Sequence, residues 1–442
     1  MRRAALHNLG CKVNAYETEA MTQLLKKAGY VIVPFDREAD VYVINTCTVT
    51  NMADRKSRQM LHRAKAKNPD AIVVAAGCFV QKQACALEED RDVDLIIGND
   101  RKHELVELLE QIWDMRGNPE LCQTFLLDIN DREEAFEDFT LERPQERTRA
   151  FLKVQDGCNQ FCTYCIIPYV RGRVRSKRPE DVLEEVKILA DNGCREVVLT
   201  GIHLSSYGAG REDTLLDLIR LIHQVRKIKR IRLGSLEPRI ITEEFVEALA
   251  SMPKICPHFH LSLQSGCDAT LQRMNRHYTT REYAASCQLL RQAFDHPAIT
   301  TDVIVGFPGE TEEEFAATEQ FLREIHFYEM HIFKYSVRKG TRAEAMPRQI
   351  PEPIKAERSA RLIALGEEMS AQFRRHYIGS TQEALLEEKR EIDGNVYFTG
   401  YTKEYVKVAV PAQGHASNKM VCGKITGMLT DDILLMSPEN KG

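Results

Sequence analysis

Residues 151–165 read Phe-Leu-Lys-Val-Gln-Asp-Gly-Cys-Asn-Gln-Phe-Cys-Thr-Tyr-Cys, and no other stretch of the chain is as informative. It predicts a buried strand, Phe151–Gln155, that runs directly into a loop with three cysteines. The spacing C-x3-C-x2-C of Cys158, Cys162 and Cys165 suits three irons of one [4Fe–4S] cluster and leaves the fourth iron open. Structural zinc sites usually have four protein ligands, so the alternative is a zinc site that borrows a distant ligand.

Strand–helix units of about 30 residues repeat after this loop. The expected strands are Phe151–Gln155, Glu196–Thr200, Arg230–Ser235, His258–Leu263, Thr300–Val305 and His331–Tyr335. Helices fill the gaps, and a long helix at Pro353–Tyr377 closes the section. Six units predict a partial (β/α)6 barrel over residues 150–377, two units short of the full eight.

Residues 1–127 also alternate strands with helices, which predicts a parallel sheet and an α/β class. Cys11, Cys47 and Cys78 each follow a predicted strand. Ligand sites form beyond the carboxyl ends of parallel strands, so we expect the three thiols to converge there. This signal is weak by itself, because buried free cysteines are common. The other cysteines are interpreted as packing residues: Cys85, Cys122, Cys194, Cys256, Cys267, Cys287 and Cys422.

Two further segments complete the chain. Residues 128–149 are acidic and contain Pro144, which predicts a linker. Residues 378–442 contain short β-rich runs with glycine turns, which predict a small antiparallel β-barrel. That segment is not basic, so any contact with RNA is expected from stacking by Tyr397 and Tyr401.

Composition bounds the class of protein. The 442 residues are 43% hydrophobic and 28% charged, which is ordinary for a globular chain. No apolar run approaches the roughly 18 residues needed to span a bilayer, and the N-terminus lacks a secretory signal. We therefore expect a cytoplasmic protein with no membrane partner. In the reducing cytoplasm, 13 cysteines favour metal binding over disulfides. The net charge of −5 means that any binding of nucleic acid must depend on local clusters of basic residues.

Five motifs carry a resemblance to a known family. They are Gly10–Asn14 (GCKVN), Asn45–Thr50 (NTCTVT), Gly77–Cys78, Phe151–Cys158 (FLKVQDGC) and His260–Gly266 (HLSLQSG). Together they resemble the radical-SAM methylthiotransferases over essentially the whole chain, in the order N-terminal methylthiotransferase domain, radical-SAM barrel and C-terminal TRAM domain. The first two motifs and Thr200–His203 look most like the branch that modifies threonylcarbamoyladenosine beside the tRNA anticodon.

The resemblance implies two [4Fe–4S] clusters and S-adenosylmethionine (SAM) as cofactors. The cysteines at 158, 162 and 165 would hold the cluster that cleaves SAM to a 5′-deoxyadenosyl radical. The cysteines at 11, 47 and 78 would hold an auxiliary cluster that carries the sulfur to be transferred. One SAM would supply the methyl group and a second the radical, and a low-potential electron donor and a sulfur source are implied partners.

Residues after successive barrel strands are candidates for SAM contacts, because barrel active sites form there. They are Tyr164, Thr200, Gly201, Ser235, Glu237, Gln264, Val305 and Gly306. Gly201 is expected to let the backbone approach the methionine end of SAM. Glu237 is expected to accept from ribose hydroxyls, and Val305 with Gly306 to pack on adenine.

Two basic stretches are candidates for contact with the phosphates of a tRNA anticodon loop. They contribute Arg55, Lys56, Arg58, Arg171, Arg173 and Arg175. Both stretches lie close in sequence to a cysteine site, so RNA bound there would approach the chemistry. The other interpretation is a solvated helix face.

Other functions stay open on the sequence alone. Two are methylthiotransferases with other substrates, isopentenyladenosine in tRNA or an aspartate of a ribosomal protein. The third is a non-catalytic electron carrier or RNA-binding scaffold with two clusters. Carriers have fully ligated clusters, whereas both cysteine sets here are one ligand short, which favours an enzyme.

Overall fold

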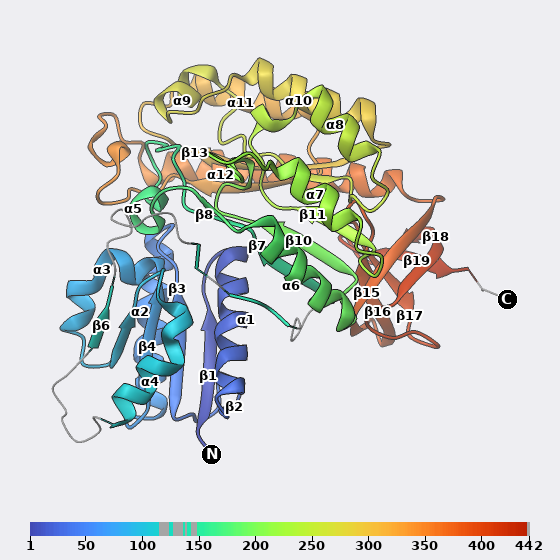
Figure 1. Ribbon diagram of the computed structural model, residues 1–442. Helices are drawn as coiled ribbons and strands as arrows, with labels where there is room; N and C mark the ends of the chain where they lie inside the picture. Colours follow the sequence, from blue (N-terminus) through green and yellow to red (C-terminus); the bar gives the residue numbers. More distant parts are fainter. Residues whose placement is uncertain (115–122, 127–135, 138, 143–147, 440–442) are drawn as a thin grey trace.

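The computed structural model describes residues 1–114, 123–126, 136–137, 139–142 and 148–439. An α/β domain, a central series of βα units and a small β-barrel follow one another along the chain (Figure 1). Within those residues, no helix is both long enough and apolar enough to cross a membrane.

The N-terminal domain is a six-stranded parallel sheet in the order β2-β1-β3-β4-β5-β6. Its elements are β1 (Arg3–Asn8), α1 (Lys12–Lys27), β2 (Val31–Ile32), β3 (Val41–Thr46), α2 (Asn51–Lys67), β4 (Ile72–Gly77), α3 (Cys78–Glu88), β5 (Leu95–Ile97), a 3₁₀ turn (Lys102–Glu104), α4 (Leu105–Asp114) and β6 (Gln123–Phe125). Val41 and Val43 join one apolar cluster, and Tyr42 and Ile44 join another on the opposite face. Helices cover both faces, as a parallel sheet requires, so the expected α/β class is confirmed.

The predicted linker, residues 128–149, lies mostly outside the described residues. Its described portion packs against the rest of the protein. Phe139 and Leu141 are buried in the central core, and the Glu137 carboxylate accepts a hydrogen bond from the backbone N–H of Lys102 at 2.9 Å. The apolar side chains in this acidic segment attach its described portion to the core, so that portion is not a flexible linker.

The central section contains the six expected parallel strands, each joined to the next through a helix. They are β7 (Arg149–Lys153), β10 (Glu196–Thr200), β11 (Arg230–Leu233), β12 (His258–His260), β13 (Ala298–Val305) and β14 (Glu329–Lys334). The helices are α5 (Ile167–Arg171), α6 (Pro179–Asp191), α7 (Leu215–His223), α8 (Glu243–Ala250), α9 (Asp268–Arg273), α10 (Thr280–Ala293), α11 (Glu312–Ile325) and α12 (Glu352–His376). A short pairing of β8 (Gln155–Asp156) with β9 (Arg175–Ser176) and 3₁₀ turns at Leu204–Ser206, Pro238–Ile240 and Arg342–Ala345 complete the section.

Hydrogen bonding divides these strands into two sheets, β11-β10-β7 and β12-β13-β14. The sheets are joined by single bridges, from Ile231 to Ile255 and from Leu236 to Leu261. The Cys256 N–H donates to the Ile231 carbonyl at 2.9 Å, but the His258 N–H donates to the Cys256 carbonyl at 2.7 Å instead of to β11, so the ladder is interrupted at this seam. The strands follow one another in chain order, but one continuous six-stranded sheet is not formed.

The central strands carry apolar side chains on one face and mostly polar side chains on the other. Ile231, Leu233, Phe259, Ile299 and Val303 lie in the core with the surrounding helices. The residues that alternate with them point the other way. We call them the polar inner face: Arg149, Glu196, Arg230, Arg232, His258, His260, Thr300, Asp302, Glu329 and His331. A full eight-stranded barrel fills its interior with branched apolar residues, so this polar lining is a departure.

The C-terminal part is a closed five-stranded barrel in the order β15-β16-β17-β19-β18. The strands are β15 (Thr381–Ile392), β16 (Asn395–Tyr401), β17 (Lys407–Pro411), β18 (Met420–Met428) and β19 (Leu434–Pro438). Neighbours are antiparallel except β17 and β19, which pair in parallel. The expectation of a fully antiparallel barrel is wrong, because a closed ring with an odd number of strands must contain a parallel pair.

Arginines from the central strands hold the C-terminal barrel in place. Arg230 is fully buried and donates to the backbone carbonyls of Tyr401 at 2.8 Å and Glu383 at 2.7 Å. The Arg149 guanidinium lies 4.9 and 4.8 Å from the ring centroids of Tyr401 and Tyr405. These two rings stack on each other, 4.5 Å apart. Tyr401 therefore belongs to this interface, which corrects its expected stacking on RNA.

Replacing Arg230 with methionine removes both donors while keeping much of the side-chain volume. Two buried carbonyls lose hydrogen bonds from a charged group, so docking of the C-terminal barrel is expected to weaken by about 2 kcal/mol. Limited trypsin digestion should then release this barrel faster than from the wild type. Arg220→Met, on an exposed position of α7, is the matched control, and equal release from both variants would contradict the role given to Arg230.

Candidate functional site

The structure brings Cys11, Cys47 and Cys78 together at the carboxyl edge of the N-terminal sheet. Cys11 precedes α1, Cys47 follows β3 and Cys78 begins α3. The thiols are close enough to influence one another. Burial first, and then the charges of Cys78 and Cys11, raise the pKa of Cys47 to about 12.

Gly10 and Asn14 fix the loops that carry the first two cysteines. Gly10 has a φ of +112°, and a Cβ there would lie 3.0 Å from Cβ and 3.1 Å from Sγ of Cys47. Only glycine permits this approach. The Asn14 side-chain amide donates to the carbonyls of Leu9 at 2.9 Å and Thr46 at 3.0 Å. Asn14 was not among the sequence candidates, although it shares the Gly-Cys-Lys-Val-Asn motif with Cys11.

Arg171 of α5 joins this site to the central section. It is fully buried, and its Nε donates to Cys78 Sγ at 3.1 Å. Its terminal nitrogens contact Glu17 Oε1 at 3.0 Å, Asp156 Oδ2 at 3.0 Å and Asn14 Oδ1 at 2.8 Å. Burial lowers the pKa of Arg171, but Asp156, Cys78 and Glu17 raise it well above its usual value. The guanidinium is therefore a permanent cation that touches one of the three thiols.

Contacts from the segment after α9 hold the second cysteine loop, residues 158–165. The Thr163 backbone N–H donates to the Met274 carbonyl at 3.0 Å, and the Thr163 hydroxyl donates to the Arg273 carbonyl at 2.9 Å. The Asn275 amide donates to two carbonyls of the loop, at 3.2 Å each. The loop is therefore anchored to the protein by residues more than a hundred positions away.

Arg276 contacts a sulfur of this second set. Its terminal nitrogen donates to Cys162 Sγ at 3.3 Å, and its Nε donates to the Tyr278 hydroxyl at 3.0 Å. Burial is the largest of the effects that raise the pKa of Cys158 to about 11 and that of Cys165 to about 12. Arg276 lies 114 residues from Cys162 along the chain, so no sequence pattern links them.

Both cysteine sets fit an iron–sulfur cluster. The buried thiols raise one another's pKa, so they stay protonated when no metal is bound. A bound metal ion lowers the pKa of its ligands and stabilises the thiolates. Each set also receives one arginine hydrogen bond at sulfur. Hydrogen bonds to sulfur and local charge are among the features that set the potential of such clusters. Three ligands each leave one iron of a four-iron cluster free.

The two cysteine sets are connected through α5. Cys165 is followed almost at once by α5, a helix of five residues that is about 8 Å long and ends at Arg171. Cys78 packs with Ile166 and Val170 in one apolar cluster. A short helix therefore separates the thiols of the second set from Arg171, which touches the first.

Among the SAM candidates, Glu237 has an open hydrogen-bonding position. The residue is 4% exposed, and its Oε2 lies 3.4 Å from His203 Nε2. Its Oε1 has no hydrogen-bond partner among the described residues. An orphaned buried carboxylate oxygen suits a ligand hydroxyl.

The other SAM candidates follow the strands as the sequence placed them, but three have different surroundings from those expected. Val305 faces the apolar core, and Cβ atoms on Gly201 and Gly306 would lie 2.7 Å from Gln155 Oε1 and 2.3 Å from Lys355 Cγ. The protein contacts alone are enough to require glycine at both positions. Four candidates have no such conflict: Tyr164, Thr200, Ser235 and Gln264.

The basic residues predicted to contact RNA fall into two groups, one exposed and one buried. Arg55, Lys56, Arg58 and Arg173 are exposed. Arg171 is enclosed, and Arg175 is 7% exposed and paired with Asp100 at 3.1 Å. The expectation that Arg171 and Arg175 contact RNA is wrong, because their guanidinium groups are used inside the protein.

Replacing Arg276 with glutamine should lower the reduction potential of a cluster bound at Cys158, Cys162 and Cys165. Loss of one charge-assisted hydrogen bond costs about 1 kcal/mol, which is on the order of 40 mV for one electron. Redox titration followed by electron paramagnetic resonance measures the shift, with iron content as a check that the ligands still bind. Arg281→Gln, on an exposed position of α10, is the control, and equal potentials for both variants would rule out this role.

Two family models match the chain in agreement with this geometry. The radical SAM superfamily model matches residues 152–322, and that of uncharacterized protein family UPF0004 matches residues 3–98. A "threonylcarbamoyladenosine tRNA methylthiotransferase MtaB" of Bacillus subtilis is 41% identical over 96% of this chain and 94% of its own. A "tRNA-2-methylthio-N(6)-dimethylallyladenosine synthase" of Pelotomaculum thermopropionicum is 36% identical over 90% of this chain and 89% of its own.

The fold is also similar to that of a solved radical SAM enzyme. The radical S-adenosylmethionine methyltransferase TsrM of Kitasatospora setae, bound to tryptophan and a SAM analog, gives a TM-score of 0.55 at 15% identity. The match covers 89% of this chain and 79% of that one. At this identity it bears on the fold alone. By its near-full-length relatives, the chain belongs to the methylthiotransferase family of radical-SAM enzymes.

Proposed function

We propose that this enzyme converts N6-threonylcarbamoyladenosine at position 37 of tRNA to its 2-methylthio derivative. The observation that carries the proposal is the match to the B. subtilis relative named for this nucleoside, 41% identical over 96% of the chain. The relative named for dimethylallyladenosine is 36% identical over 90%. A tRNA substrate places the activity in the cytoplasm, with a low-potential electron donor and a sulfur source as partners.

In this proposal the two cysteine sets have separate duties. Cys158, Cys162 and Cys165 hold the cluster that acts on SAM, and the N-terminal set holds the auxiliary cluster. When bound, the clusters and SAM supply a carbon-centred radical, a methyl group and the transferred sulfur. The protein's own part is to position them and to exclude water: Arg171 and Arg276 each hold one sulfur by a charge-assisted hydrogen bond.

We assign the contacts with SAM and RNA from the exposure and the chemical character of each side chain. Glu237 accepts from the ribose of SAM through its free Oε1. The other contacts with SAM are assigned to Tyr164, Thr200, Ser235 and Gln264. Arg55, Lys56, Arg58 and Arg173 meet the phosphates of the anticodon loop. The C-terminal barrel is the TRAM domain, and its docking by Arg230 sets where it can reach the RNA.

Deleting the gene should abolish the 2-methylthio form of threonylcarbamoyladenosine in tRNA, with the unmethylthiolated parent accumulating. Mass spectrometry of digested tRNA measures both nucleosides. Loss of the methylthio form of isopentenyladenosine instead would move the protein to the neighbouring tRNA branch. No change in tRNA would point to the ribosomal-protein substrate.

Alanine variants separate the two cysteine sets in the purified enzyme. Cys47→Ala should still cleave SAM to 5′-deoxyadenosine but not methylthiolate tRNA, whereas Cys162→Ala should lose both activities. Each variant should hold about four irons per chain, against about eight in the wild type. Cys422→Ala, in the C-terminal barrel, is the matched control and should keep both activities. Normal methylthiolation by Cys47→Ala would contradict the assignment of the N-terminal set.

Replacing Glu237 with glutamine should weaken SAM binding roughly ten-fold, because a hydrogen bond to a charged acceptor is lost. Burial raises the pKa of Glu237, but the nearby His203, then Arg276 and Arg239, lower it to about 2. The carboxylate therefore stays ionised as pH falls from 8 to 5, and SAM affinity should show no step from this group in that range. Equilibrium dialysis with the reconstituted enzyme measures it. Glu243→Gln, exposed at the start of α8, is the control, and unchanged affinity in Glu237→Gln would remove this residue from the SAM site.

A further inference from the structure

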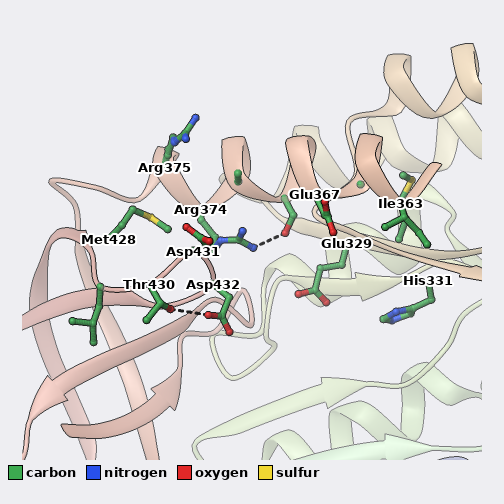
Figure 2. Close-up of a pocket in the computed structure, with 15 residues that line it drawn as sticks. Glu329, His331, Ile363, Glu367, Arg374, Arg375, Met428, Thr430, Asp431 and Asp432 are labelled. Atoms are coloured by element: carbon green, nitrogen blue, oxygen red, sulfur yellow. Dashed lines mark hydrogen bonds between the residues drawn. The ribbon is translucent and has the colours of Figure 1, made fainter. Parts of the chain in front are cut away.

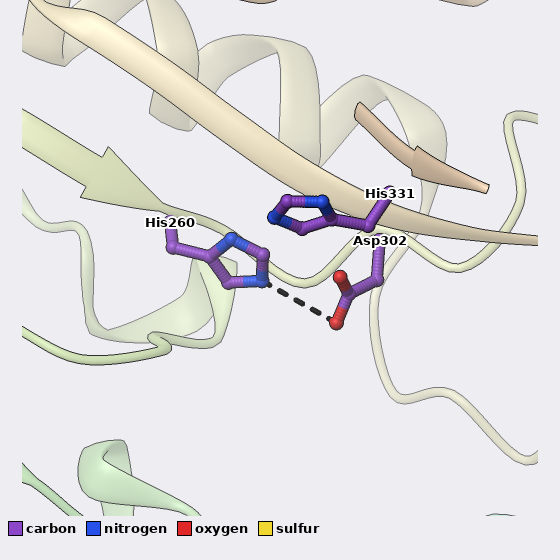
Figure 3. A group of neighbouring side chains, drawn as sticks. All are labelled: His260, Asp302 and His331. Carbon is purple, nitrogen blue, oxygen red and sulfur yellow. Dashed lines mark ion pairs between the residues drawn. The ribbon is translucent and has the colours of Figure 1, made fainter. Parts of the chain in front are cut away.

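Most charges of the polar inner face have partners within the protein. Arg232 Nε donates to Glu196 Oε1 at 2.9 Å, and Arg149 lies 3.1 Å from Glu387. Figure 3 shows a second group, in which His260 Nε2 lies 3.4 Å from Asp302 Oδ2 with His331 beside them. These charges are balanced without a ligand.

Lys12 approaches the same face from the N-terminal domain. It is the first residue of α1, directly after Cys11, and α1 packs against β7. Arg232, Arg149 and Asp302 all lie within electrostatic range of its ammonium group. Three strands of the polar inner face, β7, β11 and β13, therefore surround the end of this side chain.

Among the residues that the structure describes, Lys12 forms no ion pair, and one ring nitrogen of the neighbouring His258 neither accepts nor donates a hydrogen bond. Lys12 is exposed, and within the described residues no carboxylate or other acceptor pairs with its ammonium. His258 on β12 is 7% exposed, and its Nδ1 has no hydrogen-bond partner in the same part of the chain. Lys12 lies within electrostatic range of His258. An unpaired cation beside an unsatisfied imidazole nitrogen favours an anion with further polar atoms.

The polar inner face can be reached from outside at its β14 edge. A cavity of about 960 Å³ lies between β14, α12 and the β18–β19 loop (Figure 2). Glu329 and His331 of β14 line it, and His331 also belongs to the group with His260 and Asp302. That group resembles a metal-ligand set, but Lys12 and the arginines face the same region and disfavour a further cation there.

We propose that Lys12 binds the carboxylate of the threonyl group on the substrate nucleoside. The inference rests on the proposed function. A threonylcarbamoyl group ends in a carboxylate, whereas a dimethylallyl group is an uncharged hydrocarbon. The adenine carbon to be modified must face the auxiliary site beside Cys11, and the N6 substituent is carried on the same ring. Arg232 and Arg149 are already paired with Glu196 and Glu387, which leaves the Lys12 ammonium as the anion's partner.

The test compares two anticodon stem–loop RNAs that differ in one group. One carries threonylcarbamoyladenosine, and in the other the threonyl carboxylate is a carboxamide. Fluorescence anisotropy with the cluster-reconstituted enzyme, without SAM, gives a Kd for each. The wild type should prefer the carboxylate RNA about ten-fold, as expected for one charge-assisted hydrogen bond. Lys12→Gln should bind both RNAs equally, and Lys12→Arg should retain the preference.

Lys187→Gln, at an exposed position of α6, removes one positive charge elsewhere and should behave as the wild type. A wild type without the preference, or a Lys12→Gln variant that keeps it, overturns the inference. Methylthiolation assays on the threonylcarbamoyl RNA and on a third stem–loop that carries dimethylallyladenosine distinguish the two proposals. If the enzyme modifies threonylcarbamoyl RNA while Lys12→Gln keeps its preference, only the inference fails. If it modifies dimethylallyl RNA and not threonylcarbamoyl RNA, the proposed function fails as well.

Discussion

The enclosed charge of Arg171 is the constraint on which the rest of the structure depends. Its guanidinium contacts Glu17 from α1 and Asp156 from β8, and the ammonium groups of Lys102 and Lys153 pair with Glu17 at 2.7 and 2.9 Å. Separating such buried ions leaves uncompensated charge at a cost of about 3–5 kcal/mol per broken pair. The network adds little net stability because burial is costly, but it allows only one placement of the N-terminal domain against the central strands.

That placement determines where the chemistry can occur. Arg171 contacts Cys78, and α5 leads back within a few residues to Cys165, so one helix fixes the relation between the two cysteine sets. The same docking directs the start of α1, with Cys11 and Lys12, toward the polar inner face. Radical reactions need an enclosed, rigid site that excludes competing partners. Here the rigidity comes from buried ion pairs, because separating them would leave a buried charge without a partner.

Much of this architecture could be predicted from the sequence because it depends on local patterns. The six central strands and the strand-end positions of Cys11, Cys47 and Cys78 follow from periodicity. The roles of the arginines could not be predicted, because the tertiary fold decides which of them are exposed. Arg171, Arg173 and Arg175 form one basic run, yet only Arg173 is exposed. Gly201 likewise had the right type and position, but Gln155 is the group that approaches it.

The polar inner face could have been predicted from the alternation of polar and apolar residues in its strands, and the same pattern can be looked for in other sequences. Strands of a βα series are covered by helices on one side and face the barrel interior on the other, so they are expected to be apolar throughout. Residues 230–233 are Arg-Ile-Arg-Leu and 258–260 are His-Phe-His, which alternate with period two. Alternation usually means that one face meets water, but no face of such a strand is at the molecular surface. Polar residues at alternate positions of a strand buried on both sides therefore indicate that the second face meets polar groups. Here those groups include backbone carbonyls of the C-terminal barrel, which accept hydrogen bonds from Arg230 and Arg232.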